Sequence, residues 1–559
     1  MKKIAFIFLF TNIVTTIQAQ LYINGHIAPF DHITNTWLAT IMESQFNDDN
    51  TFTIELKNSW KQLTINNTIV DNLYTFQKIT TESTYPTTIT DADGHTVTGN
   101  IKFTFLPVIH LNGQFGYDYQ EGTITIANPE LNADSVYTAN LKWRGGTTNA
   151  EGKHKRNYNI KFEKDVKLFD MRSDNNWMLD AGQPDVFRLR NRIAMDIWND
   201  MAHKPYYADL EPKARNGVKG RVVEVFLNNE YRGIYNLSEK LDRKQMKLMK
   251  VNPLTSEIHG VLYKGISWNY TIMNDSIYQY DNHSETLYGY KVKYPDLNDN
   301  DTTDWKPLVD AINHNLILSY DDLEFEKQVS DWFDIPVLID YSIFVSSINA
   351  LDNNGKNTFW AVYDKSVNHQ LTLAPWDLDC TFGQRWGSLM ADAALPNNLV
   401  DVTIGVLYNF YRTNALQFND RLNLRYKELR QEGNVLSTDS LISRVTKYYQ
   451  ALKKSGAAQR ETAKWSGDSD VWGDTIDFDK EYDYICNWIT QHMQAIDKKR
   501  FPLQYDDNYF ERLTTIKSTI NKYNLNNKYI YTLSGQRVQN TKPLRSGIYI
   551  VNGKKIVIK

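Results

Sequence analysis

The chain has 559 residues, a formal net charge of −4 and 42% hydrophobic residues. This length is enough for several domains, and the apolar content favours folded domains over disorder. Nothing in this charge suggests the basic face that nucleic-acid binding requires, so we expect no nucleic-acid partner.

The N-terminus predicts export. Residues 1–19 begin with Lys2 and Lys3, continue with an apolar stretch and end at Ala19. This is the pattern of a secretory signal peptide that is cleaved after Ala19. The stretch is too short to span a membrane, and no later segment approaches roughly eighteen apolar residues, so we expect no membrane-spanning helix.

Residues 20–133 predict an antiparallel β domain. Segments such as TFTIEL (51–56) and GTITIAN (122–128) alternate apolar and polar residues at strand period. The run DADGHT (91–96) has the residues of a tight turn between strands. The role of this domain is left open by its sequence.

Residues 136–510 predict an α+β domain. Strand patterns come first, including residues 221–241, which form two strands around the turn residues Asn228, Asn229 and Glu230. Helical patterns follow at 185–203 and 331–351 and dominate between about 400 and 500. Strands early and helices late favour an α+β fold over a doubly wound one.

The mature chain contains two cysteines, Cys380 and Cys486. One disulfide would not make a framework, so we expect two buried thiols, although pairing stays open for an exported protein. A zinc site is not expected, because no histidines lie at ligand spacing from them.

A second predicted hairpin brings acidic residues together. NTFWAVYD (357–364) and QLTLAPWD (370–377) are strand-like, and the turn between them centres near Val367. Antiparallel pairing then places Asn357 and Asp377 nearly opposite each other. Asp352 comes five residues before Asn357 and Asp379 two residues after Asp377, so carboxylate and amide oxygens suited to Mg²⁺ or Mn²⁺ gather there.

This spacing has a use in phosphoryl transfer. There, a catalytic Asp orients the attacking hydroxyl, an Asn five positions later binds metal, and a second Asp beyond a hairpin holds the metal on the nucleotide phosphates. A surface turn or a helix cap remains the alternative for such an Asn- and Asp-rich run. Like charges at the end of an apolar strand are costly without a cation, which favours the metal site.

Three motifs in this region resemble the CotH (spore-coat protein H) kinase family. They are LKWRGGTTNAEGKHKRNYNIKF (141–162), VEVFLNNEYRGIYNLSEKLDR (223–243) and the segment from DYSIFVSSINALDNNGKNTF to PWDLDCTFG (340–383). The resemblance implies an atypical protein-kinase-like fold over residues 136–510. It also implies transfer of phosphate from ATP, with a divalent metal, to Ser or Thr hydroxyls of secreted proteins.

The same resemblance implies roles for individual residues. Asp352 would be the catalytic aspartate, and the metal ligands would be Asn357, Asp377 and Asp379. The nucleotide would be bound by Arg144, Gly145, Lys155, Arg156 and Glu239. Which of Lys155, Arg156 and Lys161 contacts phosphate stays open.

An alternative function is a kinase fold that has lost catalysis and serves as a glycan- or protein-binding adhesion module. The helix 185–203 offers no obvious glutamate to pair with a phosphate-binding lysine, as ordinary kinases require. An exported protein also meets little extracellular ATP.

After a linker, NKYNLNNK (521–528), residues 526–559 predict a small β domain. The patterns YTLSGQRV and GIYIVNGKKIVIK resemble the C-terminal sorting domain of the type IX secretion pathway of Bacteroidetes. The resemblance implies engagement of that secretion machinery, passage through the periplasm, and a secreted or cell-surface location.

Overall fold

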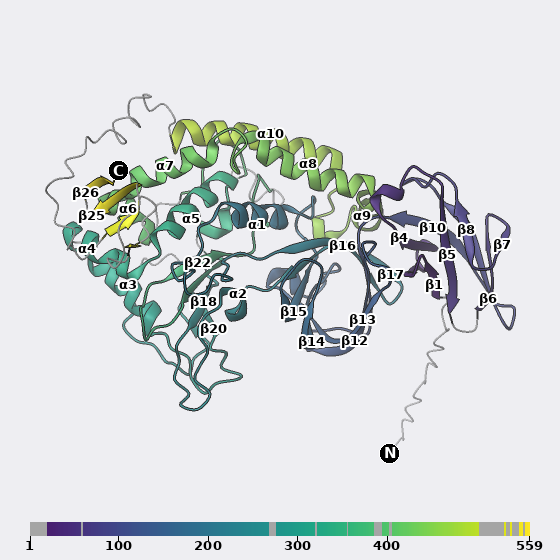
Figure 1. Ribbon diagram of the computed structural model, residues 1–559, viewed down its shortest axis with the longest axis horizontal. Helices are drawn as coiled ribbons and strands as arrows, with labels where there is room; N and C mark the ends of the chain where they lie inside the picture. The colour runs from purple at the N-terminus through teal and green to yellow at the C-terminus, as the bar shows by residue number, and fades with distance from the viewer. Residues whose placement is uncertain are drawn as a thin grey trace, which may run out of the picture. The chain divides into compact units, whose positions relative to one another are not determined.

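The structure is a computed structural model that describes residues 20–57, 60–267, 276–318, 321–354, 356–384, 394–401, 405–501, 530–532, 537–538, 547–551 and 554–558 (Figure 1). The predicted signal peptide, residues 1–19, lies outside the described residues. None of the described helices combines the length and the apolar character that crossing a membrane requires.

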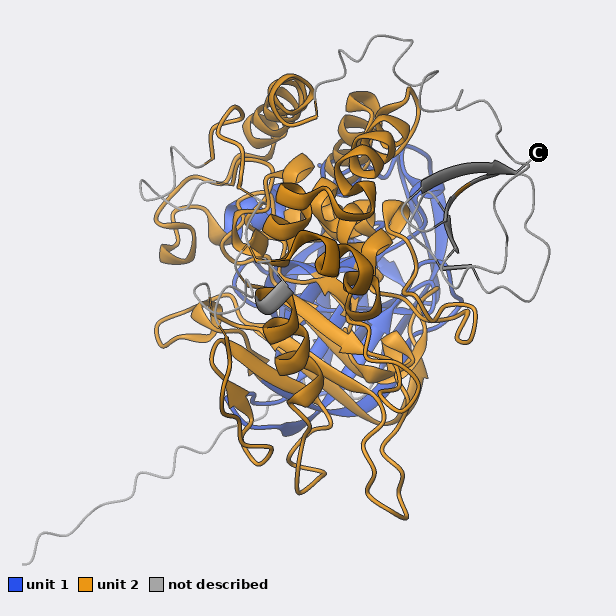
Figure 2. Ribbon diagram, turned by 90° about the vertical axis from the view of Figure 1, so that its left-hand side faces the viewer, with its two compact units in different colours: residues 1–142, 222–235, 451–464 blue, residues 143–221, 236–450, 465–559 orange. Residues whose placement is uncertain are grey.

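The chain forms two compact units, coloured separately in Figure 2. Unit 1 comprises residues 1–142, 222–235 and 451–464, and unit 2 comprises residues 143–221, 236–450 and 465–559. Both sheets and helices are abundant, which confirms the predicted α+β class. The units are discontinuous in sequence, because two later segments return to unit 1.

Unit 1 contains two sheets that share one core. Their strand orders are β2-β1-β5-β8 and β3-β4-β10-β9-β6-β7, and every neighbouring pair is antiparallel except β4 with β10. Side chains from both sheets, including Leu21, Trp37, Phe52 and Phe103, are buried together. The elements are β1 (Gln20–Ile23), β2 (His26–Ala28), β3 (Phe30–Asp31), β4 (Thr36–Thr40), η1 (Glu43–Gln45), β5 (Asn50–Lys57), β6 (Trp60–Ile65), β7 (Thr68–Val70), β8 (Leu73–Phe76), β9 (Tyr85–Asp91) and β10 (Thr96–Thr104).

The remainder of unit 1 includes the predicted turn at Asn228 and Asn229. Both residues have positive φ, 50° and 63°, as a two-residue turn between antiparallel strands requires. Glu230 already begins the next strand. The elements wholly within this part are β11 (Val108–Asn112) and β12 (Gln120–Ala127). Five described elements are shared with unit 2, namely β13 (Ser135–Arg144), β16 (Gly220–Leu227), β17 (Glu230–Glu239), α8 (Thr438–Lys454) and α9 (Ala457–Trp465).

Unit 2 contains a sheet of order β19-β20-β18-β21-β22, in which all pairs are antiparallel. β19 and β20 lie in a polar stretch of the chain and nevertheless form strands of this sheet. The strands of unit 2 are β14 (Asn157–Lys167), β15 (Ser173–Asp180), β18 (Val261–Gly265), β19 (Thr286–Leu287), β20 (Tyr290–Tyr294), β21 (Thr358–Val362) and β22 (Thr372–Pro375).

Helix α5 (Ile335–Ile348) is the centre of the helical part of unit 2. Thirteen of its residues are buried, from Ile335 to Ile348, as expected for a helix that is apolar on all sides. It packs against α1, α7 and α10. The helical elements of unit 2 are η2 (Thr147–Asn149), α1 (Arg190–Met201), α2 (Arg243–Met246), α3 (Lys306–Leu318), α4 (Asp322–Trp332), η3 (Leu351–Asn354), α6 (Val406–Thr413), η4 (Ala415–Gln417), α7 (Phe418–Arg430), η5 (Ser469–Val471) and α10 (Phe478–Lys499).

The predicted C-terminal β region contains four short strands in the order β24-β23-β25-β26. They are β23 (Ile530–Thr532), β24 (Arg537–Val538), β25 (Gly547–Val551) and β26 (Lys554–Ile558). Cys380 and Cys486 are unpaired, as expected, although only Cys380 is fully buried.

Asp340, fully buried on α5, gives a test of this packing. It accepts a hydrogen bond from Arg425 Nε at 2.9 Å and contacts His203 Nδ1 at 2.5 Å. Replacing Asp340 by Ala should lower the free energy of unfolding by about 3–5 kcal/mol, because Arg425 would lose its buried partner. Urea unfolding measures this, with Asp322→Ala as the control.

Asp322 pairs with Arg412 at 2.8 Å on the surface, where its side chain is 60% exposed. Its loss should cost less than about 1 kcal/mol. Equal unfolding midpoints for the two variants would contradict the central role of Asp340.

Candidate active site

A cavity of about 530 Å³ in unit 2 is lined by both acidic and basic side chains. Its acidic residues are Asp180, Asp185, Asp352, Asp377, Asp379 and Asp470, and its basic residues are Arg144, Lys153, Arg188, Arg192, Lys264 and Lys356. Six of the site residues predicted from the sequence therefore line this one cavity, namely Arg144, Gly145, Asp352, Asn357, Asp377 and Asp379. A concave site with many converging charges is typical of a binding or catalytic centre.

The end of α5 determines where the acidic turn lies. The helix stops at Ile348, and Asn349 adopts the left-handed conformation that commonly closes a helix, with φ of 49°. The short helix η3 follows immediately and carries Asp352, which is only 7% exposed. Asp352 is therefore fixed by the most buried helix of the unit.

The predicted hairpin is confirmed. β21 and β22 pair with Thr358 opposite Pro375, so the turn centres next to Val367. One step further, Trp376 N–H donates to the carbonyl of Asn357 at 2.9 Å. Asn357 and Asp377 thus lie at the same end of the ribbon, both with positive φ, 58° and 57°.

The side chain of Asn353 fastens this end of the ribbon. Its Nδ2 donates to the carbonyl of Asn357 at 3.1 Å and to the carbonyl of Trp376 at 2.8 Å. Asn353 is 1% exposed, so these hydrogen bonds form away from water. The run LDNNGKNTFW therefore orients its own polar side chains through a buried amide.

Five carboxylates, here called the acidic group, face one another across the cavity: Asp180, Asp185, Asp352, Asp377 and Asp379. Burial raises the pKa of Asp379 well above its usual range, and the other four carboxylates raise it further. The pKa of Asp180 is also raised by burial, although hydrogen bonds from Gly182 and Asn191 and the charge of Arg144 oppose this. Like charges at this density favour a bound cation.

Asn191, near the start of α1, connects two walls of the cavity. Its Nδ2 donates to Asp180 Oδ2 at 2.7 Å, and its Oδ1 accepts from the backbone N–H of Leu378 at 3.1 Å. Leu378 stands between Asp377 and Asp379. The helix thereby holds the acidic end of β22 against the end of β15.

Helix α1 begins with Arg190 and contains no glutamate. Its fully buried guanidinium pairs with Asp185 at 2.5 Å and with Glu481 of α10. Burial alone would lower the pKa of Arg190, but Asp185 and Glu481 raise it above its usual value. The residues that α1 presents to the cavity are Asn191, Arg192 and Met195, so α1 carries no counterpart of the kinase glutamate.

A glycine loop forms another wall. Gly145 has φ of 118°, and a Cβ there would lie 2.1 Å from Thr148 Oγ1. Thr148 Oγ1 in turn accepts a hydrogen bond from Asn157 Nδ2 at 3.1 Å. The loop is held in a conformation in which its backbone approaches the cavity closely, as phosphate-binding loops require.

Two cavity cations have no acidic partner within ion-pair distance among the described residues. Arg144 lies 5.9 Å from the centroid of the Trp376 ring, and Lys264 Nζ lies 5.9 Å from that of Phe359. Burial lowers the pKa of Lys264, and the charges of Arg144 and Lys356 lower it further against the effect of Asp377. Lys356 differs, because it pairs with Asp352 at 3.1 Å.

Three residues predicted to bind nucleotide do not line the cavity. The backbone N–H of Lys155 donates to Asp470 Oδ2 at 2.7 Å. Arg156 stacks on Trp143, 4.3 Å from the ring centroid. Glu239 is fully buried, and Arg215 NH2 lies 2.9 Å from both of its carboxylate oxygens. Each of these three residues lies outside the lining of the cavity, here called behind the wall, and contacts a neighbouring side chain.

The donor set fits a hard divalent cation. In the part of the chain that the structure describes, the side chains of Asn357, Asp377 and Asp379 form no hydrogen bond, so their oxygens are available. The only described group of three acidic or histidine side chains with ligand atoms within 4.8 Å of one another is Asp91, Asp93 and His95 of unit 1. Among the described residues, no three carboxylates of the acidic group have ligand atoms this close together. A cation in the cavity would therefore contact at most two of them in this conformation, together with the oxygen of Asn357 and other ligands.

Sequence reasoning missed Asp180, Asn191 and Lys264. Asp180 and Lys264 each interrupt or end an apolar strand, NWMLD and VLYKG, and such a charge is a signal that could have marked them. Asn191 carried no comparable signal.

Comparison with known families matches residues 141–496 to the family described as CotH kinase protein. The match covers more than half of the chain. The chain belongs to the CotH kinase family. All residues that line the cavity fall inside the matched range, so the cavity is part of the CotH kinase domain. No curated protein matches the chain.

Asp379 gives a test of the acidic group. Because its folded-state pKa is raised, the wild type loses stability as pH rises from 3.8 through the folded value. Without divalent cation, Asp379→Asn should therefore be more stable than wild type at pH 7, because the amide carries no charge to be buried. The difference should shrink as pH falls toward 3.8.

Thermal unfolding over this pH range, with and without Mn²⁺, measures both effects. Mn²⁺ should stabilise the wild type and not Asp379→Asn. The matched control is Asp439→Asn, exposed in the first turn of α8, which should behave as wild type. An equal response of Asp379→Asn and wild type to pH and to Mn²⁺ would contradict this account.

Proposed function

We propose that this CotH kinase transfers the γ-phosphoryl group of ATP to Ser or Thr hydroxyls of secreted or surface proteins. One observation carries the proposal: Asp352, Asn357 and Asp377 line a cavity together with a glycine loop and with Arg144 and Lys264, which have no ion pair among the described residues. Positioning and electrostatic stabilisation supply most of the catalysis in phosphoryl transfer.

In this proposal Asp352 accepts a hydrogen bond from the acceptor hydroxyl and takes its proton. Its burial and its position after α5 fix the direction of the carboxylate. Lys356 Nζ pairs with Asp352 Oδ2 at 3.1 Å and orients this carboxylate. Lys356 acts through Asp352 and is a positioning residue.

Asn357, Asp377 and Asp379 would hold Mg²⁺ or Mn²⁺. When bound, such a cation would supply positive charge against the charge that develops on the nucleotide phosphates. The raised pKa of Asp379 means that binding a cation would displace a proton from the acidic group. The chain's own contribution is to keep these three side chains free of internal hydrogen bonds.

Arg144, Lys264 and the backbone of Gly145 would bind the phosphates. The resemblance also assigns nucleotide contacts to Lys155, Arg156 and Glu239. We propose that these three support the wall from behind, because their contacts are with Asp470, Trp143 and Arg215. Arg144 and Lys264 then take the place of the lysine that ordinary kinases use.

We also propose that the chain acts outside the cytoplasm. The predicted signal peptide and the predicted C-terminal sorting domain support export through the periplasm and the type IX machinery to the cell surface or the medium. Protein acceptors in that compartment are then the expected substrates.

A second candidate is a CotH domain that has lost catalysis and binds glycan or protein as an adhesion module. The observation that favours it is that α1 contains no glutamate to serve as the glutamate of active kinases, and that its Arg190 is paired with Asp185 and Glu481. Calorimetry separates the candidates. ATP binding that requires Mn²⁺ or Mg²⁺ supports the kinase, and its absence at millimolar ATP supports the binding module.

Transfer of labelled γ-phosphate tests the function directly. Wild type with Mn²⁺ should label itself or a generic protein acceptor. Asp352→Asn and Asp377→Asn should each reduce the rate by at least about a hundredfold, the typical contribution of a positioned base or an electrostatic group. Asp439→Asn should label at the wild-type rate, and equal labelling by all four proteins would reject the assignment.

A further inference from the structure

Three lysines of unit 2 form a cluster without acidic partners. They are Lys240, Lys264 and Lys293, here called the lysine cluster. Within the described residues none of them has an ion pair. Lys264 lines the cavity, whereas Lys240 and Lys293 lie beyond its wall. The lysine cluster therefore extends positive charge from the cavity to the surface next to it.

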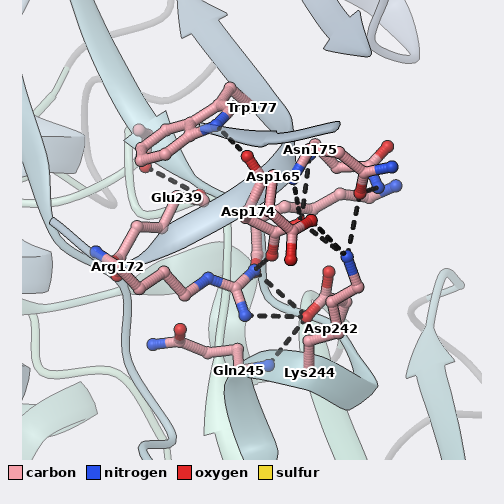
Figure 3. A network of polar contacts seen from close by, with 12 residues as sticks. Asp165, Arg172, Asp174, Asn175, Trp177, Glu239, Asp242, Lys244 and Gln245 are labelled. Carbon is pink, nitrogen blue, oxygen red and sulfur yellow. Dashed lines mark hydrogen bonds and ion pairs between the residues drawn. The ribbon is translucent and has the colours of Figure 1, made fainter. Parts of the chain in front are cut away.

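A polar network fixes the backbone at Lys240. Arg172 lies between Asp174 and Asp242, at 2.5 Å and 3.2 Å, and donates to the carbonyl of Lys240 at 3.0 Å (Figure 3). Lys244 also pairs with Asp174, at 3.1 Å. Asp174 and Asp242 thus pair with Arg172 and Lys244, and they act on Lys240 only through their charge, without an ion pair among the described residues.

Lys264 and Lys293 lie on neighbouring strands. Lys264 stands directly opposite Lys291 in the pairing of β18 with β20. Lys291 is neutralised by Glu285 at 2.7 Å. Lys293 occupies the irregularity in this pairing between Val292 and Tyr294, and has no such partner. Like charges on adjacent strands destabilise a sheet unless an anion lies between them.

The electrostatics of the cluster agree with this geometry. The pKa of Lys293 is lowered to about 8 by removal from water and then by Lys291, Lys264 and Lys240. Burial also lowers the pKa of Lys240, and the charge of Arg144 lowers it further against the opposing charge of Asp242. Lys293 therefore experiences the charges of Lys264 and Lys240, and an anion beside it would relieve this repulsion.

We propose that the lysine cluster is the acceptor subsite of the kinase and selects Ser or Thr residues flanked by anionic side chains. The anion is a carboxylate of Asp or Glu, or a phosphate already present on the acceptor. This inference rests on the proposed function and narrows it to acidic acceptors.

The position of the cluster favours the acceptor over the nucleotide. Arg144 and Lys264 lie inside the cavity, with the glycine loop and the acidic group, and are placed for phosphates of a bound nucleotide. Lys240 and Lys293 are outside that wall, so a nucleotide in the cavity leaves them without a counter-ion. Lys293 is exposed and Lys240 is half-buried, so both remain open to the side chains of an acceptor that comes from solvent.

Peptides of one length and one serine test the inference, with glutamate, phosphoserine, glutamine or lysine as the flanking residues. Wild type should phosphorylate the anionic peptides with kcat/KM about tenfold above the glutamine peptide, as one or two partly desolvated charge pairs provide. The variant Lys240→Gln/Lys293→Gln should lose this preference and keep its KM for ATP. Lys291→Gln, on the same strand but paired with Glu285, should keep the preference.

Fluorescence anisotropy of the same peptides, without nucleotide, separates this inference from the proposed function. Phosphorylation without a charge preference would overturn the acidic-acceptor inference and leave the kinase function standing. Binding that requires Lys240 and Lys293, with no phosphorylation of any peptide, would overturn the kinase function and leave the anionic ligand class standing. A raised KM for ATP with an unchanged acceptor preference in the double variant would assign the lysines to the nucleotide and overturn the inference. Preference for phosphoserine alone would support it and identify previously phosphorylated acceptors as the source.

Discussion

Repulsion among the five carboxylates of the acidic group is the constraint on which the rest of unit 2 depends. A carboxylate such as Asp379, which forms no hydrogen bond with the described residues and faces four other carboxylates, opposes folding unless a cation or a proton joins it. The surrounding residues limit this cost without removing it. Asn191 and Gly182 donate to Asp180, and Arg190 neutralises Asp185, while Asp377 is left free.

The rigid parts of the fold hold these charges in place. Asp352 follows a helix that is buried on every side, and the buried amide of Asn353 ties the ends of β21 and β22 together. A site that is built on such elements keeps its geometry when like charges repel, and is thereby ready for a cation. Repulsion among the carboxylates of the acidic group thus both lowers the stability of the fold and favours the binding of a metal ion.

Among the described residues, some basic side chains of unit 2 pair with carboxylates and others do not. Several carboxylates outside the acidic group already have basic partners, as Asp174 has Arg172 and Lys244. Arg144, Lys240, Lys264 and Lys293 are left without ion pairs among the described residues and face the cavity or the surface beside it. An anion that spans both regions, such as a nucleotide next to an acidic acceptor, would complete the charge balance.

The hairpin could be predicted from the sequence because its turn fixes the register, and the register places Asn357 beside Trp376 and Asp377. The contribution of Asp180 and Lys264 could not, because pairing between strands far apart in the chain brings them to the cavity. Lys155 and Glu239 were placed by motif alone, whereas contacts with Asp470 and Arg215 hold them behind the wall. The discontinuous unit 1 was equally beyond sequence patterns, since residues 222–235 and 451–464 join it through tertiary contacts.

The central claim is that Asn357, Asp377 and Asp379 form one cation site beside a nucleotide. A crystal structure of the protein with Mn²⁺ and a non-hydrolysable ATP analogue, recorded at the manganese absorption edge, tests it most directly. We expect an anomalous peak in contact with Asp377 and Asn357, with the phosphates between that peak and Arg144 and Lys264. A peak bound elsewhere, or phosphates that approach none of these residues, would contradict the account.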